Sequence, residues 1–397
     1  MDHFRKLLGG IASALMIAVA PQVAAQDVIK IGATAPITGG LANIYSIQGK
    51  LWEAWEKAQN DAGGIYVKSL NKKLPIKIVY YDDRSDPKLS VRFYEKLIAE
   101  DKVDFLMGPP GSPIAFAAST VAERHKFPMI HGAASDPQIY ARGFQYIQGV
   151  LGPATDWSQL TFEMMGQTKK IKTVALLVED ALYAKGVAIG VRNLAKKAGM
   201  NVIYDQTIPS DNQDFTAVIA QLKQAKPDLV YVATFPPFYI RFAKQADELG
   251  LQPPAMHCST CSAVSIRQGL GPASEQVTGE VFWVPGMKLG DYRMLETALQ
   301  TSGLDPVQWT FALISIPALE VIRAGIEKAG TLDREAVYKA IQTNEIPTVM
   351  GPFKALGKGV GTLNPFPMQV QKGQVVVIWP PNAKTGDYQF PRQKNIQ

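Results

Sequence analysis

The sequence contains few of the residues on which metal, redox and disulfide chemistry depends. Its 397 residues include two cysteines and four histidines. Two cysteines are too few for a disulfide-stabilised scaffold, and four histidines leave little material for a metal centre. Forty-one Lys and Arg against 35 Asp and Glu give a net charge of +6, spread along the chain without a basic run. This excess gives no reason to expect nucleic acid or an anionic membrane as a partner.

The motifs of several enzyme classes are also missing. Neither G-x-x-x-x-G-K-[ST] nor G-x-G-x-x-G occurs, so no nucleotide site is indicated, and G-x-S-x-G of the serine hydrolases is absent. His125, His131 and His257 are not spaced as metal ligands, and we expect each on a loop or at the surface. We therefore expect no enzymatic activity, no cofactor and no metal.

The first 25 residues have the pattern of a cleavable secretory signal. Arg5 and Lys6 precede an apolar run from Leu7 to Ala20, and small residues follow up to Ala25. The run is shorter than a membrane span, although an N-terminal membrane anchor is the alternative. We expect cleavage after Ala25 and a periplasmic protein.

The rest of the chain is globular in composition and alternates strand and helix patterns. It is 47% hydrophobic and 19% charged, with a length that suits two domains. Two successive sets of βα units predict an α/β fold of two doubly wound parallel-sheet lobes, with the ligand cleft between them. Later segments are read as a strand over 280–284, a long helix over 309–329 and a hairpin over 366–379. With so few strands they cannot form a third sheet, so the chain must cross between the lobes more than once.

Cys258 and Cys261 are spaced as C-x-x-C but follow two prolines and a short apolar segment. A redox C-x-x-C precedes a helix, whose dipole lowers the thiolate pKa. This one is expected in a loop after a strand. In an oxidising compartment a local structural disulfide is favoured, with two free thiols, redox catalysis or metal binding as alternatives.

Three motifs in order resemble one family. They are the opening segment Ile31-Gly32 to Thr38-Gly39, the stretch from Tyr81 to Pro87 (Y-D-D-R-S-D-P) and the turn from Thr348 to Pro352 (T-V-M-G-P). The chain resembles the leucine/isoleucine/valine-binding protein family, the type I periplasmic solute receptors of ABC importers. The family disulfide is missing, because Ser85 and Gly111 stand at its positions. The resemblance implies three crossovers, with lobe 1 formed by residues 27–150 plus 287–365 and lobe 2 by 151–286 plus 366–397.

The resemblance also implies half of an amino-acid site. The family's carboxylate clamp falls on Ser112, Ala133 and Ser135, in segments that follow strands and precede helices. Backbone N–H groups and two hydroxyls would converge there on an anion. The alternative is that Ser112 and Ser135 only cap the helices that follow.

The half that binds the α-ammonium group does not carry over. The family's tyrosine and glutamate correspond to Phe235 and Ser259. A buried ammonium without an anionic partner is costly, so the site should reject α-amino acids unless Glu179 or Asp180 replaces the glutamate.

The remaining predicted contacts are aromatic. Tyr183 and Phe311 match family contact positions, and Tyr45 and Trp283 lie near such positions. By composition alone, Phe311 and Trp283 would be ordinary core residues. We predict a receptor for a small organic carboxylate that lacks an α-ammonium group, with an aromatic acid as the favoured ligand. It would act as a monomer that delivers its ligand to a membrane permease. The alternatives are a receptor for branched-chain or other neutral amino acids, an amide or urea sensor, and a periplasmic hydrolase or thiol oxidoreductase.

Overall fold

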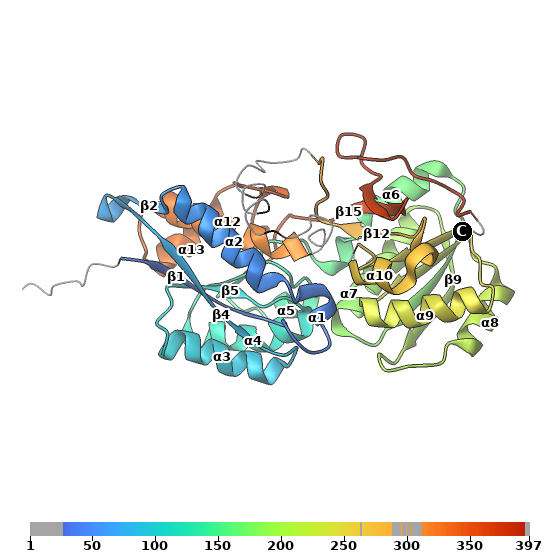
Figure 1. Cartoon of the computed structure of the whole chain (residues 1–397), viewed down its shortest axis with the longest axis horizontal. Coiled ribbons are helices and arrows are strands. Elements are labelled where there is room, and N and C mark those ends of the chain that lie inside the picture. Colours follow the sequence, from blue (N-terminus) through green and yellow to red (C-terminus); the bar gives the residue numbers. More distant parts are fainter. Residues whose placement is uncertain are drawn as a thin grey trace, which may run out of the picture.

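The computed structural model describes residues 27–262, 264–287, 295, 299, 303 and 312–393, which form two lobes, each around its own β-sheet (Figure 1). The predicted signal peptide and Phe311 lie outside the described residues. Within that part of the chain, no helix is long and apolar enough to cross a bilayer.

The first lobe contains a five-stranded parallel sheet in the order β4-β1-β5-β6-β7. These strands span Ile76–Asp82, Ile29–Ala35, Phe105–Gly108, Met129–His131 and Ile147–Gly149. Near-continuous apolar runs build them because helices cover both faces. The helices of this lobe are α1 (Ala42–Tyr45), α2 (Gln48–Asp61), α3 (Pro87–Ala99), α4 (Ser112–His125), α5 (Pro137–Ala141), α12 (Ile316–Ala329) and α13 (Arg334–Thr343).

The two faces of this sheet pack into separate apolar clusters. Helices α2 and α12 bury Trp52 and Leu319 against Met107 on one face. Helices α3 and α4 bury Tyr94 and Ala118 on the other. Two short antiparallel pairs complete the lobe, β2 (Ile65–Val67) with β3 (Lys72–Leu74) and β13 (Ile346–Thr348) with β14 (Gly351–Phe353), together with the 3-10 turns Lys68–Leu70 and Ala312–Ser315.

The second lobe contains a seven-stranded sheet in the order β16-β15-β12-β11-β10-β8-β9, in which the pairings from β12 through β9 are parallel and β15 and β16 are antiparallel additions. In that order the strands span Gln374–Val377, Phe366–Gln371, Thr278–Val281, Ala255–Cys258, Leu229–Ala233, Thr173–Glu179 and Asn201–Ile208. Its helices are α6 (Gln159–Thr168), α7 (Leu182–Lys197), α8 (Thr216–Ala225), α9 (Pro236–Glu248) and α10 (Val264–Leu270), with 3-10 turns at Ala154–Asp156 and Gly271–Ser274.

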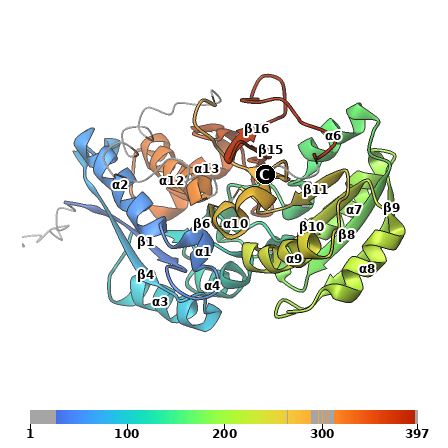
Figure 2. The ribbon, with the colours of Figure 1, turned by 45° about the vertical axis from the view of Figure 1, so that its right-hand side comes forward.

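Crossing segments join the lobes side by side. Leu151, just after β7, forms an isolated parallel bridge with Leu363, which precedes β15. The N–H of Gly152 donates to the carbonyl of Leu363 at 2.8 Å. Because parallel strands end at the same sheet edge, both lobes present their βα loops toward each other. Helix α1 of the first lobe lies against α10 of the second (Figure 2), and α4 contacts α7. The two-lobe α/β prediction is confirmed, while the lobe boundaries stay a prediction.

Two local predictions were wrong. The strand predicted over 280–284 is β12, which ends at Val281. The helix predicted over 309–329 begins at Ile316 within the described residues, since Pro317 fits only the first turn of a helix.

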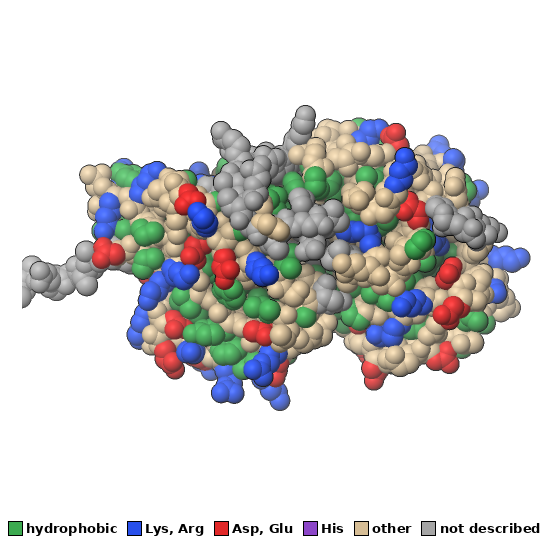
Figure 3. All heavy atoms as spheres, viewed as in Figure 1, with side chains coloured by type: hydrophobic (Ala, Val, Ile, Leu, Met, Phe, Trp, Pro, Cys, Tyr) green, Lys and Arg blue, Asp and Glu red, His purple; other side chains and the backbone are tan. Residues whose placement is uncertain are grey.

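The surface is mixed in charge. On the face seen in Figure 3, basic and acidic side chains are interspersed over both lobes, and no patch of one sign gathers there. This distribution agrees with the scattered charges of the sequence.

Candidate ligand-binding cleft

The first wall of the cleft is made by the loops after β5 and β6. Gly111, at φ 90°, turns the chain into α4, and its N–H donates to the carbonyl of Ala133 at 2.9 Å. The Ser112 Oγ accepts hydrogen bonds from the N–H groups of Ser135 and Asp136 at 3.4 and 3.3 Å. The structure therefore brings Ser112, Ala133 and Ser135 together.

Helix capping does not account for the two serines. Residue Gly111 occupies the N-cap of α4 and Asp136 that of α5, where the Asp136 carboxylate accepts from the N–H of Gln138 at 2.8 Å. The Ser112 Oγ accepts hydrogen bonds from two backbone N–H groups. Its own O–H donates to no group in the described part of the chain, so it can donate to a ligand. The hydroxyl of Ser135 likewise forms no hydrogen bond within the described part of the chain. Together with the first turn of α4, these donors suit an anion.

Aromatic rings form the facing wall in the second lobe. Tyr183, near the start of α7, lies with its ring centroid 5.3 Å from Phe235 and 5.2 Å from Trp157. Burial raises the pKa of Tyr183 well above its usual value, with smaller contributions from Glu280 and Tyr45. Tyr45 lies on α1 of the first lobe. Sequence reasoning missed Trp157, which no motif marks.

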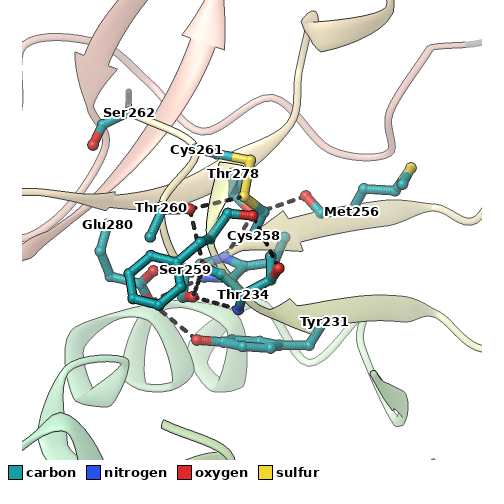
Figure 4. The surroundings of a disulfide bond; sticks show 12 residues. Tyr231, Thr234, Met256, Cys258, Ser259, Thr260, Cys261, Ser262, Thr278 and Glu280 are labelled. Atoms are coloured by element: carbon teal, nitrogen blue, oxygen red, sulfur yellow. Dashed lines mark hydrogen bonds and ion pairs between the residues drawn. A yellow bond between two sulfur atoms is a disulfide. The ribbon is translucent and has the colours of Figure 1, made fainter. Parts of the chain in front are cut away.

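The loop after β11 carries the disulfide and Ser259. The two cysteines are bonded, with Cα atoms 5.2 Å apart, and both are fully buried. Figure 4 shows Ser259 facing Thr234 of the neighbouring strand end. The Ser259 Oγ accepts from the Thr234 N–H at 3.1 Å and donates to the Thr234 carbonyl at 3.2 Å. Both hydrogen-bonding functions of this hydroxyl are therefore used inside the protein.

Trp283 follows β12 and is buried in the large apolar cluster that extends through both lobes. Phe311 lies outside the described residues, so nothing places it relative to the cleft. Both therefore remain predicted contacts.

The prediction for two histidines was wrong. His131 on β6 and His257 on β11 are fully buried, while only His125, at the end of α4, is partly exposed. The Nε2 of His257 lies 2.9 Å from a Glu280 carboxylate oxygen, and burial lowers the pKa of His131 to about 3, so that it is neutral. The error arose because a histidine inside a short strand has no polar periodicity to mark it. No group of three or more metal-ligating residues occurs in the described residues.

Comparison with known proteins identifies the family. A family model described as periplasmic binding protein matches residues 7–374. The chain belongs to the periplasmic binding protein family. It is a solute-binding protein and not an enzyme, and the family is periplasmic.

Three known proteins illustrate how similar this chain is to others in sequence and in fold. The leucine-, isoleucine-, valine-, threonine- and alanine-binding protein of Pseudomonas aeruginosa is 30% identical over 331 residues, covering 82% of this chain and 85% of that protein. A leucine binding protein of Thermotoga maritima superposes with a TM-score of 0.76 at 20% identity, covering 87% and 97%. A solute binding protein of Rhodopseudomonas palustris in complex with 3,4-dihydroxybenzoic acid gives 0.74 at 22% identity, covering 92% and 99%.

A pocket of about 430 Å³ lies between the lobes of this receptor, and Ser112, Ala133 and Ser135 are not among the residues that line it. Pro113 and Ile114 of α4 line it from the first lobe, and Phe235 and Glu179 line it from the second. The sequence pointed to Glu179 only as a possible replacement for the missing glutamate, because nothing in a single strand shows which strand-end residue faces the other lobe.

Proposed function

We propose that this receptor captures a small organic carboxylate that lacks an α-ammonium group, most favourably an aromatic acid. Binding would be noncovalent and without a cofactor. The observation that carries the proposal is the state of Ser259, whose hydroxyl is fully engaged with Thr234 where an amino-acid receptor would place a carboxylate. An ammonium group buried at that point would have no anionic partner, which costs several kcal/mol.

The first lobe supports recognition of the carboxylate. The free O–H of Ser112, the hydroxyl of Ser135 and the backbone around Ala133 are buried together between two strand ends. Each hydrogen bond to a carboxylate oxygen would contribute about 1.5–3 kcal/mol.

The second lobe supports recognition of a ring. The side chains of Tyr183 and Phe235 lie together with Trp157 as aromatic surface, and Tyr45 approaches from the other lobe. A planar aromatic acid would stack on these rings. The Rhodopseudomonas palustris protein in complex with 3,4-dihydroxybenzoic acid shows that this fold can hold an aromatic acid. Its sequence identity of 22% to this chain supports a shared fold and not a shared ligand.

Closure of the lobes would deliver the ligand. A monomeric receptor that closes about its crossovers presents one combined surface made by both lobes. We propose that a membrane permease binds this surface. Ligand binding would stabilise the closed arrangement because contacts from both lobes are made together.

The second candidate is a receptor for branched-chain or other neutral amino acids. The binding specificity of the Pseudomonas aeruginosa relative favours it. Glu179, a buried carboxylate on the pocket wall, would have to replace the missing glutamate as the ammonium acceptor.

A thermal-shift panel separates the candidates. We expect benzoate-like acids to raise the melting temperature, and leucine, valine and the neutral amide benzamide to leave it unchanged. Stabilisation by leucine or valine but by no aromatic or aliphatic acid would overturn the proposal, and stabilisation by benzamide but not benzoate would favour the amide sensor.

A further inference from the structure

The second lobe holds a buried acid–base pair that the proposed carboxylate site does not use. The Nε2 of His257 lies 2.9 and 3.0 Å from the two carboxylate oxygens of Glu280, and both residues are fully buried. His257 is on β11 and Glu280 is on β12, so the pair joins neighbouring strands. Within the described residues, His257 is the one ion-pair partner of Glu280.

Glu280 lies one strand away from the position of the missing glutamate. Strands β11 and β12 pair Cys258 with Gly279, so Ser259 and Glu280 are the next residues along the two strands. Glu280 also acts on the aromatic wall, because burial is the main cause of the raised pKa of Tyr183 and the charge of Glu280 adds to it. A carboxylate is therefore present near the predicted ammonium position, on a different strand from the expected one.

The hydrogen bonds around His257 fix where its protons lie. The Thr278 hydroxyl donates to the carbonyl of Met256 at 3.1 Å, so its oxygen accepts from the His257 Nδ1, which is 3.0 Å away. Nδ1 therefore carries a proton. A second proton must lie between Nε2 and Glu280, because two lone pairs do not approach each other to 2.9 Å. With this proton on either the imidazole or the carboxyl, the pair has no net charge.

The other groups around Glu280 are neutral donors. The Ser158 hydroxyl donates to Oε1 at 2.5 Å, and the Tyr231 hydroxyl, 2.5 Å from the Ser158 Oγ, donates to that oxygen in turn. Figure 4 shows the Tyr231 hydroxyl directed at Glu280. Strand β15, on the other edge of β12, contains no titratable side chain. Besides His257, the titratable groups that act on Glu280 in the described part of the chain are Tyr231 and Tyr183, and burial raises the pKa of both well above the usual value.

Without the proton from His257, the charge of Glu280 would decide which ligands enter. Two carboxylates shielded from water repel each other more strongly than in solvent, so an ionised Glu280 opposes the entry of an acid and attracts an ammonium group. We propose that His257 is a specificity-determining residue: the proton it shares with Glu280 cancels the charge of the second-lobe wall, so that the cleft accepts an acid and rejects an α-amino acid. This inference rests on the proposed function.

The test removes the proton carrier and keeps a hydrogen bond. In His257→Gln the amide N–H can still donate to Glu280 but supplies no titratable proton. Wild type, His257→Gln and the double variant His257→Gln/Glu280→Gln are titrated with benzoate by calorimetry at about pH 8, where an unpaired carboxyl is ionised. We expect the single variant to bind benzoate at least about tenfold more weakly than wild type. The double variant should recover most of that affinity, because its pair is again uncharged.

The pH and a second ligand separate charge from packing. As the pH falls from about 8 to about 5.5, the benzoate affinity of His257→Gln should rise toward that of wild type, because protonation of Glu280 removes the charge. Leucine binding should not weaken together with benzoate binding, since the uncovered carboxylate attracts the ammonium group. A variant that had only lost packing would bind both ligands more weakly at every pH.

His125→Gln is the matched control. His125 also pairs with a glutamate, since its Nε2 lies 2.7 Å from Oε2 of Glu95, but this pair is on the surface at the end of α4. The control should bind benzoate with wild-type affinity. If His257→Gln does not unfold cooperatively, His257→Asn replaces it, because the shorter amide can donate to Thr278 instead.

The inference and the proposed function fail differently. If His257→Gln binds benzoate as wild type does, or if the single and double variants lose affinity equally at every pH, the inference is overturned and the carboxylate receptor stands. If wild type binds no benzoate-like acid, the proposed function fails and the inference falls with it.

Discussion

The hydroxyl of Ser259 is bonded twice to the backbone of Thr234, once as acceptor from its N–H at 3.1 Å and once as donor to its carbonyl at 3.2 Å. The pairing ties the end of β11 to the end of β10 on the second-lobe side of the cleft. It leaves this loop without a group that could neutralise a cation. The specificity we propose follows from that relationship together with the serine-lined wall opposite.

The serine clamp predicts a loss of affinity on truncation. Ser112→Ala and Ser135→Ala should each weaken acid binding by about 1–3 kcal/mol, the usual cost of an unmet partner for a buried polar group. Ser112→Ala should cost more, since its Oγ also holds the N–H groups of Ser135 and Asp136. Thr120→Ala, on an exposed part of α4, is the control. Affinity is measured by titration calorimetry. Wild-type affinity in both serine variants would contradict the assignment of Ser112 and Ser135 to carboxylate binding.

The close approach of α7 to the first lobe predicts sensitivity at Gly186. A Cβ there would lie 2.9 Å from Oδ2 of Asp136 and 3.1 Å from Pro137. Gly186→Ala should therefore oppose closure and weaken ligand binding by about 1 kcal/mol or more, as overpacking does. Gly166→Ala on α6, whose Cβ would meet nothing nearer than 3.5 Å, should leave affinity unchanged. Equal affinities for the two variants would show that α7 does not approach Asp136 when the ligand binds.

The disulfide predicts a stability effect without catalysis. Closing a loop this short restricts the unfolded chain by only about 2 kcal/mol, so replacing both Cys258 and Cys261 by Ala should lower the free energy of unfolding by about that amount. Denaturant titration of the double variant measures it. Wild type should show no thiol-exchange activity, because both sulfurs are buried. Turnover in such an assay that disappears in the double variant would instead support an oxidoreductase.

Asp83 predicts a pH dependence of stability. It is fully buried, accepts from the Thr34 hydroxyl at 2.7 Å, and burial raises its pKa from 3.8 to about 6. The folded state therefore binds the proton more tightly than the unfolded chain, so this contribution is present below pH 3.8 and is lost as the pH rises through about 6. Denaturation of wild type and Asp83→Asn at pH 4 to 7 isolates it.

We expect wild type to lose stability relative to Asp83→Asn across that interval. Asp211→Asn, an exposed substitution, should run parallel to wild type. A difference between wild type and Asp83→Asn that stays constant with pH would contradict the assignment.

The sequence predicts much of this fold because strands and turns have local signals. The two successive sets of βα units are the two sheets with their helices, and the clamp segments follow strands as expected. What could not be predicted depends on contacts between distant segments. The bonds of Ser112 to the loop after β6, the pairing of His257 with Glu280, and the position of Glu179 opposite Arg84 arise only when strands align or lobes meet.

The most direct test of the central claim compares acids that differ only in the α-ammonium group. Wild type is titrated with phenylalanine and 3-phenylpropanoate, and with leucine and 4-methylpentanoate. The account predicts that within each pair the acid without the ammonium binds more tightly. Tighter binding of either amino acid would contradict it.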